Sequence, residues 1–82
     1  MARKPRQTVR YMLRDGRQIV QYGITDDFDR RRAEHEADGK RFTSMTPVGP
    51  RVKRESAKSW EQERIETYKR NHGGRPPRYN ET

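Results

Sequence analysis

Apolar residues first alternate with polar ones and later recur at helical spacing. From residue 8 onward, Val9, Tyr11 and Leu13 occupy every second position, with Arg10, Met12 and Arg14 between them. A period of two with aromatic and β-branched side chains predicts a strand. Asp15-Gly16 then predicts a hairpin turn, because glycine tolerates the positive φ that tight turns require. Residues 18–22 predict the returning strand, which ends at Gly23.

The rest of the chain predicts two helices with a third strand between them. Threonine and aspartate oxygens can cap a helix expected over residues 27–38, which Gly39 closes as a left-handed cap. Residues 40–45 predict a short strand, followed by chain-breaking prolines and a glycine. Ser56 is the expected N-cap of a second helix that ends near Arg70. The order β-β-α-β-α predicts an α+β fold, a small three-stranded antiparallel sheet flanked by helices.

The two ends of the chain differ in composition from its middle. The N-terminal end carries Arg3, Lys4 and Arg6, and the C-terminal end combines glycine, proline and arginine. We therefore expect a basic arm over residues 1–7 and a folded domain over residues 8–72. Residues 73–82 are expected to form a basic tail that packs partly on the domain.

An acidic residue interrupts the apolar stripe of the second helix. Ala57, Ile65 and Tyr68 share one face at 3.6 residues per turn, and Glu61 lies within that stripe. A carboxylate among apolar neighbours costs free energy unless it is paired, hydrogen-bonded or bound to a cation. On spacing alone, an ion pair with an arginine is the commoner explanation, and a functional carboxylate is the alternative. The neighbouring Trp60 is interpreted as a core residue rather than as a base-stacking one.

The first helix carries a cation beside an imidazole. Arg31 and His35 are four residues apart and therefore share a face, with Phe28 one turn earlier. A guanidinium binds phosphate oxygens as a fork and histidine titrates near neutral pH, so the pair suits an anionic substrate. The commoner explanation for such a run of arginines is a solvated basic face. His72, beside two glycines, is interpreted as a cation at a helix end.

Composition limits how large and stable the domain can be. Leu, Ile, Val and Phe account for only 10 of 82 residues, and 20 Lys and Arg against 12 Asp and Glu give a net charge of +8. Such values are typical of chains that stay disordered or barely fold. Because the pattern above nevertheless predicts strands and helices, we expect one domain of modest stability that binds an anionic partner. The sequence has no cysteine, no apolar run long enough for a membrane span and no signal-peptide core. A cytoplasmic location is therefore expected.

These segments together resemble the GIY-YIG nuclease superfamily over almost the whole chain. The two motif strands of that family correspond to Val9-Arg10-Tyr11 and Gln21-Tyr22-Gly23. The family's helical Arg and its His or Tyr lie eight and twelve residues after the motif glycine, which gives Arg31 and His35. The family's metal-binding Glu precedes an aliphatic residue by four positions and a Tyr by seven, which gives Glu61. The family often ends in Tyr-Asn, which matches Tyr79-Asn80.

The resemblance implies a metal-dependent endonuclease that hydrolyses phosphodiester bonds in nucleic acid, with DNA as the expected substrate. Tyr11 would be the general base or part of its relay, and His35 would take or orient its proton. Arg31 would hold the scissile phosphate. Glu61 would bind one Mg²⁺ or Mn²⁺, and Asn80 would help to fix the site from the tail. A protein partner or a homodimer would supply specificity.

The main departure from the family pattern is Gln21, which stands where the second motif tyrosine belongs. Neighbouring strand residues point to opposite faces, so the displaced Tyr22 does not replace it directly. A two-residue turn pairs Tyr11 with Val20 and places Tyr22 on the Tyr11 face. A three-residue turn with a glycine bulge pairs Tyr11 with Ile19 and places Gln21 there, and we favour this second register.

Gln21 also favours an alternative function. A chain that lacks the second motif tyrosine fits a nucleic-acid-binding module with the same fold and with weak or absent cleavage. A structural protein of a larger nucleic-acid assembly is a third and weaker interpretation.

Overall fold

The structure confirms the predicted order of elements. The computed structural model describes residues 7–80, so the basic arm expected over residues 1–7 lies, apart from its last residue, outside the described residues. The elements are β1 (Val9–Asp15), β2 (Gln18–Thr25), α1 (Phe28–Ala37), β3 (Ser44–Pro47), α2 (Arg54–Asn71) and a final 3₁₀ turn, η1 (Arg78–Asn80). The three strands form one antiparallel sheet, so the α+β fold is confirmed. Neither helix within residues 7–80 has the length and apolar character of a membrane span.

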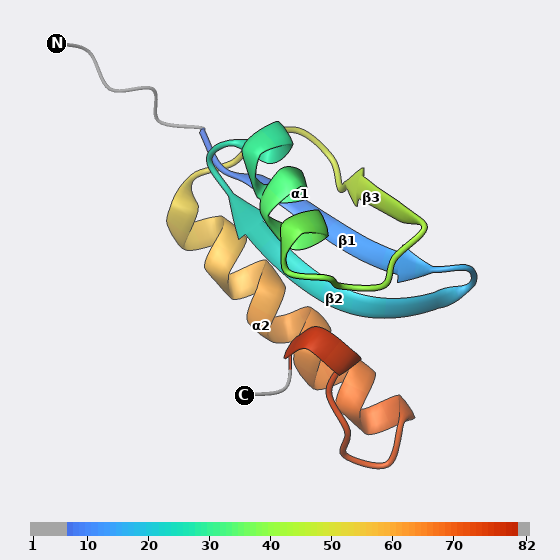
Figure 1. Ribbon diagram of the computed structural model, residues 1–82. Helices are drawn as coiled ribbons and strands as arrows, with labels where there is room; N and C mark the ends of the chain where they lie inside the picture. Colours follow the sequence, from blue (N-terminus) through green and yellow to red (C-terminus); the bar gives the residue numbers. More distant parts are fainter. Residues whose placement is uncertain (1–6, 81–82) are drawn as a thin grey trace, which may run out of the picture.

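The hairpin between β1 and β2 turns one residue later than predicted. β1 is the central strand, with β2 and β3 on its two sides (Figure 1). Asp15 pairs with Gln18, so the turn consists of Gly16 and Arg17. Gly16 has a φ of 65°, whereas no described residue other than glycine has a positive φ. A glycine at the first central position is typical of a type II′ turn, which suits the twist of paired strands.

A bulge close to this turn sets the register of the two motif strands. The pairing shifts between Leu13 and Arg14, which leaves Val20 as the extra residue on β2. Beyond the bulge, Tyr11 lies opposite Gly23, so neither predicted pairing of Tyr11, with Val20 or with Ile19, is correct. The favoured side-chain placement still holds. Gln21 is two residues from Gly23 and therefore faces the same side of the sheet as Tyr11.

The two helices lie on opposite faces of the sheet (Figure 1). On one face, the Tyr11 ring meets Phe28 of α1 edge-on, with ring centroids 6.4 Å apart. On the other face, the Tyr22 ring meets Trp60 of α2 edge-on, with centroids 5.7 Å apart. Because Tyr22 pairs with Met12 and not with Tyr11, the two tyrosines point to different helices. The side chain of Tyr22 is thus excluded from the Tyr11 face.

The few apolar residues gather mainly on the α1 side of the sheet. The buried cluster there consists of Tyr11, Leu13, Val20 and Met45, and it is flanked by Phe28, Phe42 and Tyr79. Burial of these side chains is the main favourable contribution available to so polar a chain. The shortage of apolar residues is therefore met by concentrating most of the core on one face, while a smaller contact between Tyr22 and Trp60 packs the other.

The third strand and the second helix begin at positions other than those predicted. β3 covers Ser44–Pro47 instead of residues 40–45. The amide of Thr43 already donates to the Arg14 carbonyl at 2.6 Å, so pairing starts only there. Pro47 is tolerated in β3 because β3 is an edge strand. Proline has no backbone N–H, and on an edge strand this loss need not remove a hydrogen bond between strands.

The N-cap of α2 is Lys53, which makes no side-chain capping bond, so Ser56 lies inside the first turn and is not the cap. The reason is the two-way backbone pairing of Thr8 with Val52, at 3.0 and 2.9 Å. This bridge holds the chain beside β1 immediately before the helix begins. The start of α2 is therefore determined by a tertiary contact rather than by a capping side chain.

The C-terminal turn returns to the open edge of β2. The side-chain amide of Asn80 accepts from the Tyr22 amide at 2.7 Å and donates to the Tyr22 carbonyl at 2.9 Å. Asn80 thus pairs with the edge strand as a further strand residue would. Next to it, the Tyr79 hydroxyl accepts from the Arg41 amide at 2.8 Å. The tail therefore anchors both the sheet edge and the loop after α1.

Candidate active site

Gly23 provides the space in which the Tyr11 ring lies. The two residues are directly opposite in the sheet, and a Cβ atom added to Gly23 would overlap the phenol ring and its oxygen. Tyr11 is 2% exposed as a result. The ring passes over the edge strand on the α1 face of the sheet, which brings its hydroxyl to His35 of α1.

The hydroxyl of Tyr11 is hydrogen-bonded to His35. Its oxygen lies 2.8 Å from Nε2 of His35, in a buried contact, and His35 is only 4% exposed. The first-helix pattern therefore does not form a purely solvated basic face, since its histidine points into the protein. Chemically, such a bond lets the imidazole either accept the phenol proton or donate its own to the phenol oxygen.

The far side of His35 is occupied by Lys40 and Gln21. Nζ of Lys40 lies 2.9 Å from Nδ1 of His35 and donates to Oε1 of Gln21 at 3.0 Å. Lys40 is one of 20 lysines and arginines in the chain, and its spacing alone does not single it out. Its position just after the predicted cap at Gly39, which has a φ of 75°, is the signal that places it beneath the last turn of α1.

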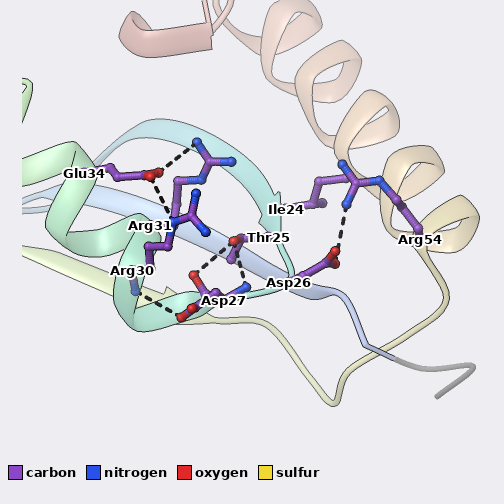
Figure 2. A pocket seen from close by; sticks show the side chains of 8 residues that line it. All are labelled: Ile24, Thr25, Asp26, Asp27, Arg30, Arg31, Glu34 and Arg54. Carbon is purple, nitrogen blue, oxygen red and sulfur yellow. Dashed lines mark hydrogen bonds and ion pairs between the residues drawn. The ribbon is translucent and has the colours of Figure 1, made fainter. Parts of the chain in front are cut away.

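Arg31 extends into solvent at the rim of the same site. Its guanidinium forms an ion pair with Glu34 at 3.3 Å, and both side chains are more than 40% exposed. Glu34 also pairs with Arg30 at 3.3 Å, so that one carboxylate lies between two guanidinium groups (Figure 2). An ion pair this exposed contributes little free energy. Arg31 can therefore exchange Glu34 for another anion at low cost.

Glu61 is partly buried and is not part of an ion pair. Among residues 7–80, no side chain forms a hydrogen bond or ion pair with its carboxylate. Burial raises the pKa of Glu61, and the more distant charge of Arg54 lowers it in part. Arg54 itself pairs with Asp26 at 3.4 Å (Figure 2). The expected ion pair between Glu61 and an arginine is therefore not found.

These groups line one cleft beside the edge strand. Its volume is about 410 Å³, and its wall consists of Tyr11, Gln21, Gly23, Ile24, Arg31, Glu34, His35, Asp38, Lys40 and Glu61. The four residues singled out from the sequence for chemistry, Tyr11, Arg31, His35 and Glu61, all belong to this wall. A second hollow of about 230 Å³ adjoins it, shares Ile24, Arg31 and Glu34, and is drawn in Figure 2.

Burial and charge shift the pKa values of the three hydrogen-bonded groups. Burial raises the pKa of Tyr11 to about 12, and the nearby charge of Arg31 offsets only part of this rise. Burial, followed by the charges of Lys40 and Arg31, lowers the pKa of His35. Burial also lowers the pKa of Lys40. In the cleft as it stands, Tyr11 and His35 are therefore both neutral at neutral pH.

Other residues singled out from the sequence lie outside the cleft wall. Trp60 is half-buried on the opposite face of the sheet, where the Arg10 guanidinium lies 5.9 Å from its ring centroid. Nδ1 of His72 lies 2.8 Å from the Tyr68 carbonyl at the end of α2, which fits its interpretation as a helix-end residue. Asn80 acts on the backbone of Tyr22 rather than on the cleft.

The cleft provides one carboxylate for a metal ion rather than a cluster of ligands. Within residues 7–80, no three His, Cys, Asp or Glu side chains gather at one point. A single half-buried carboxylate without a cation fits Mg²⁺, which keeps several waters and often binds through one or two carboxylates together with substrate oxygens.

A comparison of the chain with protein-family models, with curated proteins and with solved structures gives no match.

Proposed function

We propose that the protein is a metal-dependent endonuclease of the GIY-YIG type that hydrolyses phosphodiester bonds in nucleic acid. The observation that carries this proposal is the cleft, in which a buried phenol–imidazole pair adjoins an exposed arginine and a carboxylate without an ion-pair partner. Phosphodiester hydrolysis needs these components: a proton acceptor for water, a cation for the phosphate oxygens and a metal ligand.

Arg31 is the proposed ligand of the scissile phosphate. The guanidinium binds two oxygens of one phosphate as a fork, whereas the carboxylate of Glu34 is shared with a second guanidinium. Glu34 already divides its charge between Arg30 and Arg31. Substrate binding then replaces the contact between Glu34 and Arg31, and Glu34 stays paired with Arg30.

Glu61 is the proposed ligand of one Mg²⁺ or Mn²⁺ ion. The raised pKa of its carboxyl reflects burial that no ion pair compensates, and a bound cation supplies that compensation. When bound, the metal provides Lewis-acid stabilisation of charge on the phosphate and leaving oxygens. The role of the protein here is to present one carboxylate across the cleft from Tyr11.

Tyr11 is the proposed base for the attacking water. Its oxygen is fixed by the hydrogen bond to His35, and its ring is fixed by the sheet through Gly23. A phenolate is a strong base, but a pKa of about 12 keeps most of the phenol protonated at neutral pH. This feature favours the second candidate function, a nucleic-acid-binding module with weak cleavage.

The partner that fits the charge is nucleic acid, with DNA as the proposed form. A net charge of +8 favours phosphate contacts that release counterions and weaken steeply with salt. Phosphate contacts carry no base sequence by themselves, so a protein partner or a homodimer is the proposed source of specificity. A cytoplasmic site of action belongs to the same proposal.

A plasmid-nicking assay tests the proposal and separates it from the second candidate. Supercoiled plasmid is incubated with the full chain in Mg²⁺, in Mn²⁺ and in EDTA. Metal-dependent conversion to open circles supports the nuclease. Binding that weakens with salt, without any metal-dependent product, overturns the nuclease and supports the binding module.

A further inference from the structure

The side chain of Lys40 lies at the centre of a polar cluster behind the catalytic histidine. Its Nζ is 2.9 Å from Nδ1 of His35 and 3.0 Å from Oε1 of Gln21. It also lies 5.5 Å from the ring centroid of Tyr79, which the tail brings to this point. An amide oxygen and an aromatic face are both partners that favour a cation. These two partners stabilise the ammonium and oppose the effect of burial, which lowers the pKa of Lys40.

The ammonium determines which nitrogen of His35 carries the hydrogen. A lysine ammonium has three donors and no acceptor, so the Nδ1 atom next to it has to accept. A protonated imidazole would place two donors 2.9 Å apart, and the contact would be repulsive. A neutral imidazole has only one N–H, which then lies on Nε2. Nε2 is the atom that faces the Tyr11 hydroxyl.

We propose that Lys40 is a positioning residue that holds His35 in the neutral Nε2–H tautomer, so that His35 donates to the Tyr11 oxygen and cannot take its proton. This inference rests on the proposed function only for its catalytic consequence. The hydrogen-bond pattern itself involves residues 11, 21, 35 and 40 and needs no substrate. The proposed tautomer decides between the two roles that the sequence leaves open for His35, which are to take the Tyr11 proton or to orient it.

The tautomer determines the direction of proton movement in the cleft. The phenol proton of Tyr11 leaves towards solvent, and the resulting phenolate accepts the hydrogen bond from Nε2–H. The phenolate then takes one proton from the attacking water as the new oxygen–phosphorus bond forms. The bond between phosphorus and the leaving oxygen breaks, and its electron pair remains on that oxygen. His35 keeps its proton throughout and stabilises the charge on the Tyr11 oxygen.

This arrangement also gives Gln21 a function of its own. Gln21 stands where the second motif tyrosine of the family belongs, and here its oxygen accepts from Lys40. The residue therefore supports Lys40 instead of reaching the reacting groups. In this protein the pair of Gln21 and Lys40 orients the imidazole from behind.

The charges around His35 come from the middle of α1, from its C-cap and from the loop after it. Lys40 and Arg31 lower the pKa of His35, whereas Asp38 and Glu34 raise it. Loss of the Lys40 charge removes the largest of these charge effects. Lys40→Met is therefore expected to raise the pKa of His35 and to release Nδ1 as a site for the ring hydrogen.

Long-range proton–nitrogen NMR of the full chain tests the tautomer directly. The ring nitrogens are labelled in wild type, Lys40→Met and Lys40→Arg, each also carrying His72→Gln so that only one histidine remains. In wild type we expect Nδ1 to resonate as an unprotonated nitrogen and Nε2 as a protonated one. Lys40→Met is expected to move both signals towards a mixture, and Lys40→Arg, which keeps a cationic donor, is expected to retain most of the wild-type pattern.

Two outcomes overturn the inference. A wild-type spectrum with the hydrogen on Nδ1 contradicts the tautomer, and an unchanged tautomer in Lys40→Met contradicts the role of Lys40. Nicking by the same variants provides the catalytic readout, with a loss of about tenfold or more at neutral pH expected for Lys40→Met. Failure of wild-type nicking would instead overturn the proposed function, and the spectra would still decide separately whether Lys40 sets the tautomer.

Discussion

Gly23 lies opposite Tyr11 in the sheet, and the absence of a side chain at Gly23 allows the phenol ring to cross the edge strand and reach His35. The glycine is required by close approach rather than by its backbone conformation, since its φ is not positive. The proposed site therefore depends on a glycine at the position opposite Tyr11.

Gly23→Ala is expected to destabilise the domain by about 1–3 kcal/mol, because the added methyl overlaps the Tyr11 ring and forces it out of place. Urea unfolding measures the loss, and NMR of the His35 ring reports whether its bond to Tyr11 survives. Gly39→Ala is the control: its cost of about 1–2 kcal/mol comes from a positive φ alone. A Gly23→Ala protein with wild-type stability and an intact Tyr11–His35 bond would contradict the overlap.

Tyr11→Phe is expected to lower metal-dependent nicking by about 10²–10⁴-fold, since it removes the proposed base and keeps the ring. Tyr22→Phe is the matched control, because the Tyr22 ring faces Trp60 on the opposite side of the sheet. Equal losses in the two variants would show that neither hydroxyl acts in the cleft.

The nicking rate is expected to rise with pH throughout the neutral and moderately alkaline range. The active form of Tyr11 is the phenolate, and the raised pKa of about 12 lies above this range. The phenolate fraction, and with it the rate, then increases about tenfold per pH unit. Single-turnover rates in Mg²⁺ between about pH 6 and pH 9 would check this. A rate that stays flat across the alkaline half of this range would contradict a phenolate base.

Glu34→Gln is expected to tighten nucleic-acid binding by about two- to fivefold, because it removes the exposed competitor for Arg31. Glu36→Gln changes the net charge equally but affects a pair with Arg32 at 4.0 Å instead. Titration of labelled DNA at fixed salt compares the two. The same gain in both variants would assign the effect to net charge and not to Arg31.

Asn80→Ala is expected to cost about 1–3 kcal/mol of stability, since it leaves the amide and carbonyl of Tyr22 without their partners. Asn71→Ala, at the exposed end of α2, is the control for loss of an asparagine. Asn80→Asp keeps the acceptor but places a second oxygen against the Tyr22 carbonyl, so its cost is expected to exceed that of Asn71→Ala as well. Urea unfolding of the full chain checks this order, and equal stability of all three variants would contradict it.

The elements could be predicted from the sequence because their signals are local. Alternation from Val9, the cap at Asp27 and the left-handed Gly39 each depend on a few neighbouring residues. The predicted register of the hairpin is wrong because Gly16 occupies the first and not the second position of the turn, and because a bulge adds Val20 to β2. The predicted start of α2 is wrong for a similar reason, since a bridge to Thr8 determines it.

Some residues of the candidate site could be predicted from local spacing in the sequence, whereas others depend on long-range contacts. Spacing along the helices identifies Arg31, His35 and Glu61, because period and neighbours carry the information there. Spacing does not single out Lys40, because its contact with His35 depends on how the chain turns after the helix cap. The lack of an ion pair at Glu61 could not be predicted from the sequence either, because spacing alone favours an ion pair with one of the many arginines. Contacts between elements are what the sequence does not show.

The most direct test of the proposed site is metal-dependent nicking by wild type and by Glu61→Ala, with Glu63→Ala as the control. Glu63 lies on the exposed side of the same helix, so its loss changes the net charge without touching the cleft. We predict open-circle product for wild type and Glu63→Ala in Mg²⁺, and none above background for Glu61→Ala despite undiminished DNA binding. Metal-dependent cleavage by pure Glu61→Ala at the wild-type rate would contradict the proposed site.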